Sequence, residues 1–311
     1  MPAQQCAAVT TPDTIWAFCP NLGAAYAFAV FFGLTFCTHV AQGIYYRKAY
    51  TWVIAMSALW QMAAYIFRVL SINAPASLGA YAAWFVLILV APLWTNAFVY
   101  MVMGRMVWNF TSSAKVFGIT AWNFTAIFVI LDIITFFIQV YGAASTQSSP
   151  TISASEVLKD LHIYMAGVGV QQFFILVFLA CAIQFHRTIL QERKLNGVTK
   201  SKAMTLLYTL YTCLVLITMR IIFRLVEYSD GLESTIPSHE AYQYCLDSLP
   251  MLLALVLLNV VHPGRLMSGQ ESDMPSRKQR KSGLRTKPNL DYSALAVELK
   301  NGHYSPLGAM V

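Results

Sequence analysis

Charged residues are scarce in this sequence of 311 residues, and their scarcity limits the class of protein. Asp, Glu, Lys and Arg together make up 11% of the chain, whereas soluble globular domains carry about 25%. Hydrophobic residues make up 57%. A chain with so few charged side chains cannot surround a folded core with a water-facing surface, so a soluble domain is excluded.

The sequence also lacks the motifs of the common enzyme classes. It contains no G-x-S-x-G, no H-E-x-x-H, no P-loop and no dinucleotide fingerprint. A metal set could be imagined from His39, His186, His262, Asp132 and Asp247. The orientation predicted from the basic residues places the histidines toward one face of the membrane and the acids toward the other. These side chains should therefore not converge on one metal ion at bond lengths of about 2 Å. We predict no enzymatic activity, no metal and no cofactor.

Paired cysteine motifs and an N-terminal basic segment are missing as well. The six Cys residues show no C-x-x-C spacing, and those at 37, 181 and 213 fall in apolar runs, where packing is the default role. Cys6, Cys19 and Cys245 are expected on or near the outer side, and a disulfide among them is left open. Residues 1–21 contain no Lys or Arg, so we expect no cleaved signal peptide and a first helix that is its own signal anchor.

The sequence has instead seven long apolar runs. About 20 helical residues cross the ~30 Å hydrocarbon core of a bilayer. We expect transmembrane helices at residues 23–46, 50–70, 78–107, 116–141, 163–186, 203–226 and 241–261, with a kink at Pro92. The predicted fold class is all-α, a polytopic membrane helix bundle of seven transmembrane helices. It comprises an N-terminal segment (1–22), the transmembrane domain (23–264) and a polar tail (265–311).

The basic residues indicate the orientation, because loops rich in Lys and Arg stay in the cytoplasm. Of the 21 Lys and Arg residues, 17 fall in the tail or in loops on the same side of the membrane. The N terminus is therefore predicted outside and the C terminus inside. The net charge of +7 reflects this topology, and we predict no nucleic-acid partner.

Much of that charge lies in one segment of the tail, Ser276–Lys287. A basic segment beside a membrane is attracted to anionic lipids by ~1 kcal/mol per charge. The alternative is a disordered, solvated tail that only enforces the topology.

Ionisable residues within the apolar runs are the candidates for function, because each costs several kcal/mol in a bilayer unless it is paired. Arg220, Arg224 and Glu227 are spaced i, i+4 and i+7 and therefore share one helix face. The candidate substrate-binding set, all expected in the outer half of the membrane, is Arg68, Asp132, Gln139, Arg220, Arg224, Glu227 and Asp247. A secondary polar set is His39, Gln171 and Glu240.

Two interpretations of these residues stay open. Arg–carboxylate pairs between helices could serve only to fix the register of the bundle. Alternatively, they line a cavity open to the outer leaflet that accepts a polar head group while the chain of the ligand stays in lipid. His39 alone is more typical of a structural hydrogen-bonding residue, and Gln171 near Gly167 is more typical of close helix packing.

Short motifs occur in a fixed order along the apolar runs. They are Pro20-Asn21 with His39, Tyr65-x-x-Arg68, Ala91-Pro92 with Tyr100 and Gly104-Arg105, Asp132 with Gln139, Gly167-x-x-x-Gln171, Arg220-x-x-x-Arg224-x-x-Glu227, and His239-Glu240 with Tyr244, Asp247 and His262-Pro263-Gly264. This series resembles the fungal RTA-like family, also called the lipid-translocating exporter family. The resemblance covers residues 19–264.

The resemblance implies movement or export of amphipathic lipids, sphingoid-base-like or sterol-like, and of lipid-like toxicants. Membrane lipids or amphipathic small molecules are then the partners, and the fungal plasma membrane is the expected location, with an internal membrane as the alternative. A seven-helix lipid receptor or sensor that regulates a membrane stress response is the rival function. Seven spans, an outer N terminus and the basic loop at 187–202 suit that function equally well. The oligomeric state stays open.

Overall fold

Seven long helices dominate the computed structural model, which describes residues 6–111, 114–145, 154–191, 197–227, 229, 236, 239–269 and 272–275. Each of the seven is long and apolar enough to cross a membrane. The predicted all-α bundle of seven spans is confirmed, and the chain is an integral membrane protein. The basic segment Ser276–Lys287 lies outside the described residues, as do Arg193 and Lys194 of the basic loop.

The first three spans follow a short N-terminal helix, α1 (Ala7–Thr10). They are α2 (Leu22–Tyr46), α3 (Trp52–Asn73), which the 3-10 turn η1 (Ala49–Thr51) precedes, and α4 (Leu78–Phe110). Asn21 and Ser77 stand at the starts of α2 and α4, where their side chains accept hydrogen bonds from the backbone N–H groups of Ala24 and Ala80. These caps satisfy donors that a helix start leaves unpaired.

The next three spans begin after a small hairpin in which β1 (Lys115–Val116) pairs antiparallel with β2 (Ile119–Thr120). The spans are α5 (Ala121–Ser145), α6 (Ala154–Gln191) and α7 (Gly197–Glu227). The hairpin occupies the first residues of the fourth predicted run, whereas α6 and α7 begin before the predicted residues 163 and 203. Both helices start with polar turns, which hydropathy does not detect because it reports only the apolar part of a helix.

The last span is built from several pieces: α8 (Glu240–Tyr242), the π-helical η2 (Gln243–Ser248), α9 (Leu249–Val260) and α10 (Pro263–Leu266). Pro250 has no N–H group to donate to the carbonyl of Leu246, so a regular α-helical pattern cannot run through this point. A π-helical turn carries one extra residue and is frequent at functional sites.

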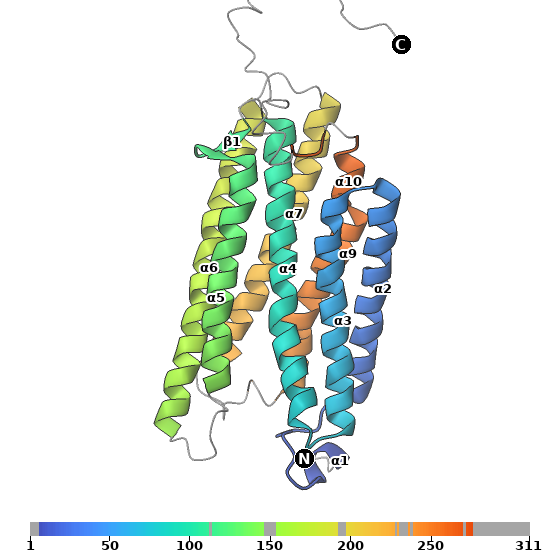
Figure 1. The fold of residues 1–311 in the computed structure, drawn as a ribbon, viewed down its shortest axis with the longest axis vertical. Coiled ribbons are helices and arrows are strands. Elements are labelled where there is room, and N and C mark those ends of the chain that lie inside the picture. Colours follow the sequence, from blue (N-terminus) through green and yellow to red (C-terminus); the bar gives the residue numbers. More distant parts are fainter. Residues whose placement is uncertain are drawn as a thin grey trace, which may run out of the picture.

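The spans run roughly parallel to the long axis, with α5 and α6 on one side of the bundle and α2 and α3 on the other (Figure 1). The central helix α4 contacts α3, α5 and α7. Residues 6–21 lie at one end, which we call the N-terminal end of the bundle; α10 lies toward the opposite end (Figure 1).

At the opposite end, the buried Lys48 holds the segment that follows the last span. Its Nζ donates to the Gly269 carbonyl at 2.7 Å, to Ser272 Oγ at 2.8 Å and to Asp273 Oδ1 at 2.9 Å. Asn109 Nδ2 adds a hydrogen bond to the Ser272 carbonyl at 3.0 Å. The predicted boundary after residue 264 therefore falls inside α10, and the first residues of the predicted tail pack on the bundle.

Candidate functional site

A cluster of four charged side chains lies between α7 and η2, toward the N-terminal end of the bundle. We call Arg220, Arg224, Glu227 and Asp247 the charged cluster; all four are buried. Asp247 is central, since its two oxygens lie 2.5 Å from Arg220 Nε and 2.5 Å from Arg224 Nη2. Glu227 accepts from Arg224 Nη1 at 2.8 Å. Two positive and two negative charges make the cluster neutral, which a low-dielectric interior requires.

A proline in the central helix leaves one backbone carbonyl available as a further partner of this cluster. Pro92 lies inside α4 and has no N–H, so the carbonyl of Ile88, four residues earlier, is left without its helical donor. Arg220 Nη2 donates to this carbonyl at 2.9 Å. Pro92, where a kink was predicted, thus does more than interrupt the helix, because it leaves the Ile88 carbonyl as an acceptor for a buried guanidinium.

Arg68 forms a second centre, close to the charged cluster but with its own partners. It is fully buried, and its Nη2 donates to Glu240 Oε1 at 2.6 Å while its Nε donates to the Tyr244 hydroxyl at 3.1 Å. Its guanidinium carbon lies 4.5 Å from the ring centroid of Trp84 and 5.1 Å from that of Trp16. Aromatic faces stabilise a desolvated cation in this geometry. The two tryptophans were not among the predicted site residues, and no local spacing pattern marks them.

Glu240 links this centre to the N-terminal segment, because its Oε2 accepts from the backbone N–H of Asn21 at 2.6 Å. The segment is closed by a disulfide between Cys6 and Cys19, which answers the question that the sequence left open. Cys245 is exposed and carries a free thiol.

Two members of the predicted set lie away from the arginines. Asp132 Oδ2 accepts from Asn96 Nδ2 and from the Tyr100 hydroxyl, both at 3.0 Å, and no guanidinium of the described residues pairs with it. Gln139 Nε2 donates to Gln171 Oε1 at 3.0 Å. The arginines and carboxylates of the predicted set therefore do not all pair with one another: Glu240, from the secondary set, is the carboxylate that pairs with Arg68.

His39 is also remote from the cluster. It is buried and lines a cavity of about 360 Å³ between α2 and α3, near the opposite end of the bundle. Across the described ranges, no group of three or more His, Cys, Asp or Glu residues could hold a metal ion.

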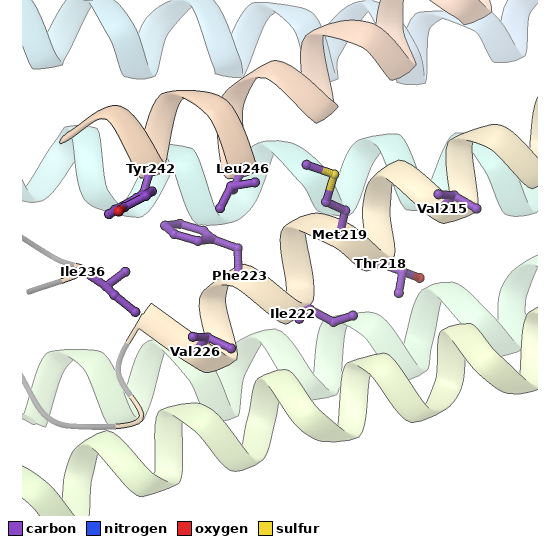
Figure 2. Close-up of a pocket in the computed structure, with 9 residues that line it drawn as sticks. All are labelled: Val215, Thr218, Met219, Ile222, Phe223, Val226, Ile236, Tyr242 and Leu246. Atoms are coloured by element: carbon purple, nitrogen blue, oxygen red, sulfur yellow. The ribbon is translucent and has the colours of Figure 1, made fainter. Parts of the chain in front are cut away.

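An apolar groove runs along the outer surface of α7, beside the last span. Its volume is about 570 Å³, and Figure 2 shows the nine side chains that line it: Val215, Thr218, Met219, Ile222, Phe223, Val226, Ile236, Tyr242 and Leu246. Exposed fractions of 67% for Val215 and 51% for Ile222 show that the groove opens away from the bundle. Sequence reasoning missed this groove, although its α7 residues recur at helical spacing.

The groove and the charged cluster lie on the two sides of one helix contact. Phe223 and Leu246 line the groove, and each is followed in the chain by a cluster residue, Arg224 and Asp247 respectively. The helices α7 and η2 pack against each other here. The groove and the charged cluster are therefore formed by consecutive residues of the same two elements.

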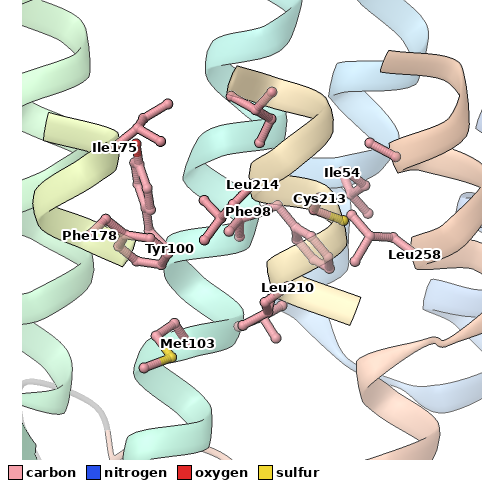
Figure 3. Close-up of a cluster of buried hydrophobic side chains, with 14 of the residues drawn as sticks. Ile54, Phe98, Tyr100, Met103, Ile175, Phe178, Leu210, Cys213, Leu214 and Leu258 are labelled. Carbon is pink, nitrogen blue, oxygen red and sulfur yellow. The ribbon is translucent and has the colours of Figure 1, made fainter. Parts of the chain in front are cut away.

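Beyond the cluster, toward the opposite end, the bundle is closed by a layer of buried apolar side chains (Figure 3). Phe98 of α4, Leu210 and Leu214 of α7 and Leu258 of α9 belong to this layer. Apolar packing thus lies between the charged cluster and Lys48.

Comparison with known proteins gives a consistent result. Residues 54–270 match the family described as RTA1 like protein. The chain is 38% identical over 272 residues to the probable lipid transporter atnI of Emericella nidulans, covering 84% of this chain and 70% of that protein. It is 30% identical over 197 residues to protoporphyrin uptake protein 1 of Saccharomyces cerevisiae, covering 63% of each.

A more distant relative is the sphingoid long-chain base transporter RSB1 of Saccharomyces cerevisiae, at 20% identity over 82% of this chain and 75% of that protein. No solved structure is significantly similar to the chain. The matched residues 54–270 include the charged cluster, Arg68, Asp132 and the groove. The chain belongs to the RTA1-like protein family, as its ordered motifs indicated.

Proposed function

We propose that this protein moves, or helps to move, amphipathic lipid-like molecules across or out of the bilayer. The observation that carries the proposal is an apolar, outward-facing groove behind which a buried, neutral cluster of two arginines and two carboxylates is packed. An acyl chain fits the groove, and a polar head group fits the cluster. The names of the relatives, a probable lipid transporter and a sphingoid long-chain base transporter, support the same class of cargo.

The cluster offers a head group partners of both charge signs. Guanidinium groups bind phosphate or carboxylate in bidentate fashion, whereas Glu227 and Asp247 suit an amine such as that of a sphingoid base. Breaking a buried ion pair leaves an uncompensated charge, so the head group must replace each partner that it displaces. Entry requires α7 and η2 to separate near Phe223, and the π-helical turn of η2 is the irregular element at this contact.

We place the N-terminal end of the bundle outside the cell and the Lys48 end in the cytoplasm. The excess of Lys and Arg on the latter side supports this orientation. The Cys6–Cys19 disulfide supports it independently, because disulfides persist in oxidising compartments. The site would then face the outer leaflet of the plasma membrane.

The test is lipid movement in sealed liposomes that contain the purified protein. Fluorescent sphingoid base and fluorescent phospholipid would be followed between leaflets, with Glu227→Gln and the groove variant Ile222→Trp beside the wild type. Asp160→Asn, at a half-buried carboxylate near the start of α6, is the matched control. We expect movement in the wild type and the control, and loss in the two site variants without loss of folded protein.

Absence of movement in a folded wild type, across several lipids and with a proton gradient imposed, would overturn the proposal. Lipid binding without a change of leaflet would then favour the lipid sensor. Loss of movement only in proportion to loss of folded protein would assign the cluster a role in bundle register.

A further inference from the structure

Three carboxylates are buried in the described part of the bundle, and one of them lacks a cationic partner. Glu227 and Asp247 pair with arginines of the charged cluster. Asp132 is 3% exposed and is bound only by neutral groups, the Asn96 amide and the Tyr100 hydroxyl. A carboxylate in a low-dielectric interior needs a compensating positive charge, and the described side chains supply none here.

The hydrogen bonds around Asp132 leave two oxygens unused. Asn96 Nδ2 and the Tyr100 hydroxyl both donate to Oδ2, and neither Asp132 Oδ1 nor Asn96 Oδ1 has a hydrogen-bond partner among the residues described. Both unused atoms are acceptors, so they cannot satisfy each other. The two side chains are nevertheless already joined by the hydrogen bond from Asn96 Nδ2 to Asp132 Oδ2.

Among the residues that the structure describes, no other charge near Asp132 could serve this carboxylate. From α4, the facing groups are Tyr100 and the neutral Asn96. Two contacts show which part of α6 lies beside Asp132. Phe178 packs on Phe128, one turn before Asp132 in α5, and Gln171 accepts a hydrogen bond from Gln139, two turns after it. Between Gln171 and Phe178, α6 carries the neutral Gln172, which donates to Thr218 of α7, and otherwise only apolar side chains. Figure 3 shows Ile175 and Phe178 beside Tyr100. The arginines of α7 are bound to Asp247, Glu227 and the Ile88 carbonyl.

We propose that Asp132 binds and releases a proton, and that this site couples lipid movement to a proton gradient. The proton adds to Oδ1 and converts the carboxylate to a neutral carboxylic acid. Its O–H then donates to Asn96 Oδ1, so that acid and amide are joined by two parallel hydrogen bonds and both unused acceptors are satisfied. Release returns the carboxylate and one proton, with no other bond made or broken. Asn96 and Tyr100 are the positioning residues.

The site is suited to this role by its place in the fold. Asp132 lies near the middle of α5, within a span that is otherwise free of charged residues. Its partner Asn96 lies on α4, two turns beyond the Ile88 carbonyl that binds Arg220. A change at Asp132 that moves α4 therefore also moves an acceptor of the charged cluster. The coupling role rests on the proposed function, whereas proton binding itself does not.

Infrared difference spectroscopy of the full-length protein in liposomes tests proton binding without any transported lipid. The carbonyl stretch of a protonated carboxylic acid, recorded as the pH is lowered, should appear in the wild type and in Asp160→Asn. It should be missing in Asp132→Asn, which keeps the shape of the side chain, and should be shifted in frequency in Asn96→Ala. Size-exclusion chromatography and circular dichroism establish that each variant is folded.

An unchanged band in Asp132→Asn would overturn the proposal. So would a band present at every pH, because the acid would then never release its proton, or a band that responds to sodium instead of pH, which would make this an alkali-cation site. A pH-sensitive dye inside the liposomes tests coupling: a lipid gradient should drive proton movement in the wild type and not in Asp132→Asn. A wild type that shows the band but moves no lipid would refute the proposed function and leave the proton site standing.

Discussion

Replacing Asp247 with Asn removes the single charge that two buried guanidinium groups share. Asp247 is 1% exposed and lies 2.5 Å from both Arg220 and Arg224. In the variant, Glu227 still neutralises one arginine, and the other stays buried with the Ile88 carbonyl as its main partner. Breaking a buried pair costs about 3–5 kcal/mol. Because Asn keeps the volume and one acceptor oxygen, we expect the free energy of unfolding to fall by about 3 kcal/mol.

The assay is reversible unfolding in mixed micelles, followed by circular dichroism. The control Asp160→Asn should change the free energy of unfolding by no more than about 0.5 kcal/mol, because its carboxylate is half-buried and outside the cluster. Combining Asp247→Asn with Arg220→Met restores neutrality and should recover much of the loss. A small cost for the single variant, or strictly additive costs in the double variant, would refute the ion-pair reasoning.

Three further predictions concern the packing of the bundle. Gly142→Ala should sharply lower the yield of folded protein, measured by size-exclusion chromatography, because a Cβ there would lie 2.5 Å from the backbone nitrogen of Tyr164. Gly169→Ala, where an added Cβ would meet no atom of another part of the bundle within 4 Å, should fold normally. Lys48→Met should release residues 267–269 and 272–275 and speed their cleavage by a protease, whereas equal cleavage rates would show that Lys48 does not hold them. Pro92→Ala should slow lipid movement more than it lowers stability, because the restored N–H competes with Arg220 for its carbonyl; equal losses of both would contradict this.

The spans could be predicted because hydropathy is a local property of each segment. The shared face of Arg220, Arg224 and Glu227 was predictable for the same reason, since helical spacing alone places them together. The partners of Arg68 and Asp132 could not be predicted, because they depend on which helices meet and at what height. Glu240 at the start of the last span and Asn96 on α4 are set by that arrangement.

The start of α6 illustrates a second limit of sequence reasoning. Its first turns contain Glu156, Lys159 and Asp160, so they resemble a polar loop by composition although they are helical. The groove on α7 is a third case, because its lining residues resemble any lipid-facing stripe. Only the neighbouring span shows that this stripe borders a concave surface.

If a lipid chain binds in that groove, as proposed, the outward opening of the groove determines what can contribute to its affinity. A ligand that enters from the bilayer leaves lipid tails, not water, and lipid tails are as apolar as the groove. Its chain therefore gains little by binding, and the surrounding phospholipids compete for the same surface in great excess. Discrimination must then come from the head group. Occupancy will follow the mole fraction of ligand in the membrane, so adding carrier lipid or detergent at constant ligand will empty the site.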